Sequence, residues 1–133
     1  MTTKEWLNRG RDAMREIETL EKAKSAAASR AALAKSEITE KIAKRTKGRN
    51  DETLVKYAEY SAELDRQIAE LHYTLAEIAR AIYSVRDGTL RLVLLNRYVL
   101  FKTWEQIAVD MNFTYRHITR IHGKALQEVN VPE

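Results

Sequence analysis

The strongest constraint on the fold is a long, unbroken seam of mostly apolar residues between Leu54 and Val85. Its members are spaced alternately three and four residues apart, which places them on one face of an α-helix and is typical of a coiled coil. A helix of this length spans roughly 45–50 Å at ~1.5 Å per residue, and one face of it has to be buried against another helix. The seam positions are Leu54, Tyr57, Ser61, Leu64, Ile68, Leu71, Leu75, Ile78, Ile82 and Val85.

The partner for this seam is expected in the N-terminal segment, where a looser rhythm of the same kind predicts a helix over about residues 3–45. Its apolar positions are Met14, Ile17, Leu20, Ala27, Ala31, Ala34, Ile38 and Ile42. Residues 44–52 contain a glycine, an Asn-Asp pair and four basic residues, and this composition is typical of a loop. With the second helix over about residues 52–87, we expect residues 1–87 to form a long helical hairpin, an antiparallel coiled coil. The seam suits pairing within one chain or between two chains.

The composition favours an all-α protein. One proline and four glycines in 133 residues, with helix-favouring residues dominating, argue against a β-sheet. The absence of cysteine excludes disulfides and thiolate metal sites. A formal net charge of +4 and a pI near 9.4 are compatible with a polyanionic partner. No segment resembles a signal peptide or a span of ~20 apolar residues, so we expect a soluble, cytoplasmic protein without membrane contact.

A second domain is expected over residues 88–133, because the pattern there changes from one long helix to several short ones. Gly88 is expected to end the long helix, and Thr89 to cap the helix that follows. The sequence "TWEQ", from Thr103 to Gln106, has the form of a capping box, in which two side chains satisfy each other's free backbone N–H groups. It predicts that a short helix begins at this point.

The end of this domain has the pattern of a helix-turn-helix. Asn112 tolerates the left-handed conformation that a tight turn between helices requires, and Thr114 can cap a final helix over residues 115–129. A small residue, Ala108, allows the two helices to cross closely, and branched apolar residues fix one helix on the other. The positions expected to face inward are Ile107, Ala108, Met111, Phe113, Ile118, Ile121 and Ala125.

The outward face of the helix over residues 115–129 predicts DNA binding, because its first turns place two arginines, a tyrosine and a threonine there. Arginine reads guanine edges with two hydrogen bonds, and Thr and Tyr contact bases or phosphates. The predicted base-reading residues are Tyr115, Arg116, Thr119 and Arg120. The predicted phosphate contacts are Arg97, Lys102, His117 and Lys124. The competing interpretation is a small bundle in which this helix merely packs.

Neither metal binding nor catalysis is expected. His117 and His122 are five residues apart, so they do not share a helix face, and no nearby carboxylate pair completes a ligand set. The sequence has no glycine-rich phosphate loop, no nucleophile elbow and no converging carboxylates. We therefore predict a non-enzymatic protein that uses no cofactor and no metal.

The stretch "LRLVLLNRYVLFKTWEQIAVDMNFTYRHITRIHGKALQEV" resembles region 4 of the sigma-70 family, which reads the −35 promoter element. The whole chain also resembles a family of small proteins of unassigned role, encoded in phages and prophages of Gram-positive bacteria, with such a C-terminal domain. The resemblance implies that base reading falls on Tyr115, Arg116, Thr119 and Arg120, where the sigma family usually has Arg, Glu, Arg and Gln. Nothing in the chain resembles sigma region 2. A role with RNA polymerase would therefore be that of a partial sigma mimic or an activator.

The function that these features favour is that of a sequence-specific transcription regulator. Its partners would be double-stranded DNA and RNA polymerase, and the coiled coil would make it a homodimer. One alternative is a DNA-packaging protein, since small terminase subunits also join a helix-turn-helix to a coiled-coil arm. Another is a coiled-coil protein-interaction module in which the basic helix is incidental. A large ring in solution favours packaging, and an absence of salt-dependent DNA binding favours the interaction module.

Overall fold

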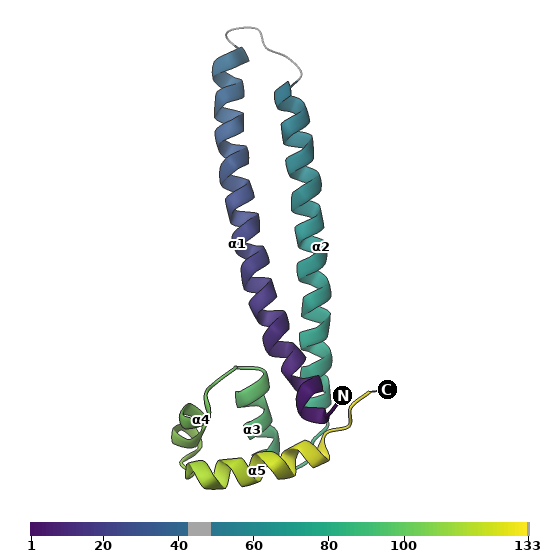
Figure 1. Ribbon diagram of the computed structural model, residues 1–133, viewed down its shortest axis with the longest axis vertical. Helices are drawn as coiled ribbons and strands as arrows, with labels where there is room; N and C mark the ends of the chain where they lie inside the picture. The colour runs from purple at the N-terminus through teal and green to yellow at the C-terminus, as the bar shows by residue number, and fades with distance from the viewer. Residues whose placement is uncertain (43–48, 133) are drawn as a thin grey trace. The chain divides into compact units, whose positions relative to one another are not determined.

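The computed structural model describes residues 1–42 and 49–132, and it confirms an all-helical protein, with no strand in those ranges. In this described part of the chain, five helices follow one another (Figure 1). They are α1 (Thr3–Ile42), α2 (Arg49–Tyr83), α3 (Gly88–Tyr98), α4 (Trp104–Met111) and α5 (Tyr115–Glu128). Most of the predicted basic loop lies outside the described residues. None of the helices in the described ranges is both long enough and apolar enough to cross a membrane.

The junction between α2 and α3 differs from its prediction. α2 ends at Tyr83, and Gly88 is the first residue of α3 rather than the residue that stops α2. The cap of α3 is Asp87 and not Thr89, because the Asp87 carboxylate accepts hydrogen bonds from the backbone N–H of Thr89 at 2.9 Å and of Leu90 at 3.2 Å. An aspartate in this position also has the charge that a helix N-terminus favours.

The helices divide into two compact units. Unit 1 comprises Met1–Arg15 and His72–Glu133, and unit 2 comprises Glu16–Leu71. Both α1 and α2 therefore contribute to both units. The boundary predicted between residues 87 and 88 falls inside unit 1 and stays a prediction about domains.

In unit 2, residues of α1 and α2 contact each other along the seam. Lys24 of α1 forms an ion pair of 2.6 Å with Asp65 of α2. Ile17 and Ala27 of α1 and Leu64 of α2 are buried. The predicted seam positions of α2 in this unit are all buried or half-buried, as the spacing of three and four requires.

Unit 1 holds the main cluster of buried apolar side chains, to which α2, α3, α4 and α5 contribute. The first turns of α1 also take part, because Trp6 and Leu7 belong to the same cluster. Gly10 allows this approach: a Cβ atom there would lie 3.1 Å from the Ile78 Cδ1 atom and 3.5 Å from the Tyr98 carbonyl oxygen. Residues from both ends of the sequence therefore build one core.

Candidate functional site

The site begins at the N-terminus of α4, where the predicted capping box is confirmed. The Thr103 side chain accepts a hydrogen bond from the Gln106 backbone N–H at 3.2 Å, and the Gln106 side chain accepts one from the Thr103 N–H at 2.9 Å. Two backbone donors that the helix leaves free are thus satisfied by local side chains. The capping box therefore fixes the residue at which α4 starts.

The turn between α4 and α5 has the predicted left-handed residue. Asn112 adopts φ 56° and ψ 44°, and the Phe113 N–H donates a hydrogen bond of 2.9 Å to the Ala108 carbonyl oxygen. Thr114 then caps α5, since its hydroxyl oxygen accepts from the His117 N–H at 3.1 Å. The predictions for Asn112 and Thr114 are confirmed, and together these residues determine the path from one helix into the next.

We expect Asn112→Ala to lower the free energy of unfolding by about 1 kcal/mol, because alanine lacks the short polar side chain that lets asparagine adopt the left-handed conformation. The matched variant Asn112→Gly is expected to stay within ~0.5 kcal/mol of the parent, since glycine adopts this conformation without steric cost. Denaturant unfolding of the full chain measures both. Equal losses in the two variants would mean that the turn needs the asparagine side chain and not its backbone conformation.

One face of α5 is buried in the core of unit 1. Ile118 and Ala125 are fully buried, and Ile121 and His122 are nearly so. From α4, Ile107 and Ala108 are buried in the same cluster, and Met111 and Phe113 pack against it half-buried. Every position predicted to face inward is therefore buried or half-buried.

The opposite face of α5 is exposed and carries the four predicted base-reading residues. Tyr115 is 54% exposed, and Arg116, Thr119 and Arg120 are also exposed, as is Lys124 further along. The Thr119 hydroxyl donates to the Tyr115 carbonyl at 3.0 Å, so this side chain is turned onto its own helix.

A polar hollow of about 440 Å³ lies at the N-terminus of α5 and brings several of these residues together. It is lined by Thr114, Arg116, His117 and Arg120. An Arg120 guanidinium nitrogen lies 3.0 Å from His117 Nδ1. The His117 and Phe113 rings pack edge to face, with their centroids 4.8 Å apart. Two arginines beside the positive end of a helix dipole make this a favourable place for an anion such as a phosphate.

The two predicted phosphate contacts before α4 have intramolecular partners. Arg97 donates to the Lys102 carbonyl at 3.0 Å, and its guanidinium lies over the Trp104 ring, 4.6 Å from the centroid. Burial, and then the neighbouring Arg11, lower the pKa of Arg97. The Lys102 ammonium forms a 2.7 Å ion pair with Asp110. Arg97 thus ties α3 to the loop before α4, and the structure does not bring either residue into the hollow at α5.

Behind the exposed face lies a buried polar pair that the sequence pattern did not predict. The Tyr98 hydroxyl and His122 Nε2 are 2.6 Å apart, and the Trp104 ring centroid lies 4.5 Å from that of His122. Burial raises the pKa of Tyr98 to about 12, and burial lowers the pKa of His122 to about 4, helped by Lys4 and Arg97. A neutral His122 therefore joins α3, α4 and α5 at neutral pH. The two residues are 24 positions apart, so no local signal could have paired them.

Within residues 1–42 and 49–132, no group of three or more His, Cys, Asp or Glu side chains is arranged to hold a metal ion. Comparisons of the chain with protein-family models, with curated proteins and with solved structures found no match.

Proposed function

We propose that this chain is a sequence-specific DNA-binding transcription regulator of phage or prophage origin, acting in the cytoplasm. α4, the turn and α5 form a sigma-70 region-4-like helix-turn-helix, and α5 reads the major groove. α1 and α2 form an antiparallel coiled-coil arm for a second copy or for RNA polymerase. The observation that carries the proposal is the two-sided character of α5, which buries Ile118, Ile121 and Ala125 and exposes two arginines, a tyrosine and a threonine.

The dimensions and charge of α5 support this assignment. The major groove of B-DNA is ~12 Å wide and admits one α-helix, and in helix-turn-helix proteins the N-terminal residues of the second helix contact the bases. The exposed residues Tyr115, Arg116, Thr119 and Arg120 lie in the first two turns of α5. The polar hollow at the same end of the helix would accept a backbone phosphate, which fixes the position of the protein on DNA without reading sequence.

The test is selection of duplexes from a randomised pool by the purified full-length protein, with the molar mass recorded by light scattering. The proposal expects an enriched motif, palindromic if the protein is a dimer. Binding that shows no enrichment and disappears at moderate salt would remove the sequence-specific role, because such binding is purely electrostatic. A large ring with weak sequence preference would instead support a DNA-packaging subunit.

Arg116→Ala and Arg120→Ala are each expected to reduce the discrimination between the selected duplex and a scrambled one by ~1–3 kcal/mol, the usual contribution of an arginine bound to a guanine edge. Fluorescence anisotropy with both duplexes at several salt concentrations measures this. Arg80→Ala is the matched control, because Arg80 is exposed in the last turn of α2 and lies outside the proposed interface. Full discrimination by both α5 variants would refute the assignment of α5 as the reading helix.

A further inference from the structure

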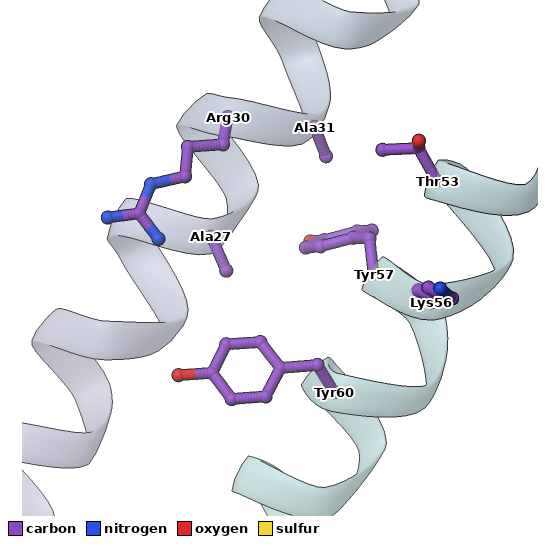
Figure 2. Close-up of a pocket in the computed structure, with 7 residues that line it drawn as sticks. All are labelled: Ala27, Arg30, Ala31, Thr53, Lys56, Tyr57 and Tyr60. Atoms are coloured by element: carbon purple, nitrogen blue, oxygen red, sulfur yellow. The ribbon is translucent and has the colours of Figure 1, made fainter. Parts of the chain in front are cut away.

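A second candidate binding site lies in unit 2, in an apolar hollow of about 300 Å³ between α1 and α2. Figure 2 shows Ala27 and Ala31 of α1 facing the rings of Tyr57 and Tyr60 of α2. Arg30 also lines the hollow, and in Figure 2 its guanidinium points away from the space between the helices.

The hollow exists because small side chains on one helix meet large ones on the other. Ala27 is only 5% exposed, whereas Tyr60 remains 47% exposed although it lines the same space. Alanine side chains are too short to cover two tyrosine rings. The volume is at the lower limit of the ~300–1,000 Å³ found for ligand pockets, so it suits one large apolar side chain better than an extended ligand.

The charged side chains that line the hollow are positive. Among the described residues that line it, the charged ones are Arg30 and Lys56, and no carboxylate accompanies them. The Lys56 ammonium lies 3.7 Å from a Glu52 carboxylate oxygen, and the two side chains are 73% and 67% exposed; such exposed pairs neutralise little charge.

We propose that this hollow docks a helix of a partner protein that inserts one apolar side chain and flanks it with carboxylates. Grooves between paired helices take amphipathic helices in this way, with anchors on one face. The flanking carboxylates would lie near Arg30 and Lys56.

A second copy of this chain fits the hollow less well. A two-fold interface brings the same surface of both copies together, so the basic residues around one hollow would face those around the other. Like charges placed opposite each other oppose association. The inference depends only on unit 2, and its test contains no DNA, so its failure and that of the proposed DNA-binding role are distinguishable.

The probe is a library of alanine-based peptides of about 20 residues, long enough to be helical in water, randomised at one central position and at its neighbours on the same face. Selection on the full-length protein should enrich Leu, Met, Phe or Trp at the centre and Asp or Glu around it. Binding of the best peptide, followed by fluorescence anisotropy, should weaken with added salt.

Ala31→Glu places a carboxylate in the hollow and should weaken that peptide about tenfold to a hundredfold, the ratio that burial of one apolar side chain produces. Ala32→Glu makes the same change at an exposed position of the same helix and should leave binding unchanged. Ala31→Leu, which fills the hollow without adding charge, should also weaken binding. Circular dichroism of each variant verifies that the helices are intact.

Three results would overturn the proposal. One is a library that enriches no sequence, or enriches basic residues around the anchor. Another is equal binding by Ala31→Glu and Ala32→Glu. The third is a dimer in light scattering that dissociates with Ala31→Glu alone, which would assign the hollow to a second copy of the chain.

Discussion

Replacing Ile118 with alanine is expected to lower the free energy of unfolding of the protein by about 2–5 kcal/mol. The Ile118 side chain is 0% exposed, and it lies in the first turn of α5 in the same buried cluster as Ile107 of α4 and Leu94 of α3. The substitution removes apolar groups, so the free energy gained by burying them away from water is lost. It also leaves a cavity among three closely packed helices. Few single changes in this chain should cost more.

Such a loss is a large share of the ~5–15 kcal/mol that stabilises an ordinary domain. Thermal unfolding and denaturant titration measure it, and DNA binding should be tested only at temperatures where the variant is folded. Val109→Ala is the matched control, because Val109 is on α4 but 79% exposed, and its change is expected to stay within ~0.5 kcal/mol. Equal effects of the two substitutions would mean that α5 does not pack on α4 as the structure has it.

The helix caps and the turn of α4 and α5 could be predicted from the sequence, because each depends on residues a few positions apart. The capping box of Thr103 and Gln106 is read from residues three apart, and Asn112 and Thr114 are identified by their own conformational preferences. The buried face of α5 follows from helical periodicity. The exposed face of α5 follows from the same periodicity, because it consists of the positions that do not belong to the buried face.

Features that depend on contacts between distant residues could not be predicted in this way. The sequence pattern does not show that Trp6 and Leu7, near the start of the chain, join the core built by α3, α4 and α5. The phosphate contact expected of Arg97 stays a prediction, but the position of its guanidinium over the Trp104 ring could not be predicted from the sequence. Composition identifies a charge; only tertiary packing determines what that charge faces.

The cap of α3 illustrates a local error. Asp87 and Thr89 are both good cap residues, and the sequence pattern favoured the second, on the expectation that Gly88 ended α2. In the structure α2 ends at Tyr83, and the Asp87 carboxylate accepts two backbone hydrogen bonds. A sequence pattern places a helix boundary only to within a few residues. Here the error in the end of α2 led to Thr89 being predicted as the cap of α3 in place of Asp87.

Acidification from pH 6.5 to pH 4 is expected to destabilise the protein by about 3 kcal/mol through His122 alone. Burial, and then the positive charges of Lys4 and Arg97, lower the pKa of His122 from 6.5 to about 4 in the folded chain. Between these values the unfolded chain binds a proton that the folded chain does not. The free energy of unfolding therefore falls as the pH falls through this window, and above pH 6.5 the group makes no further difference.

The experiment compares denaturant unfolding of the parent and of His122→Phe at several pH values between 7 and 4, since carboxylates titrate in part of the same window and must be subtracted. His122→Phe is expected to be less stable at pH 7, because the Tyr98 hydroxyl loses its buried partner at 2.6 Å, but to lose less stability on acidification. His72→Gln is the control, since His72 is exposed on α2 and its replacement should keep the parental slope. If His122→Phe showed the same pH dependence as the parent, proton uptake by His122 could not be the cause, and the buried pair with Tyr98 would not control acid stability.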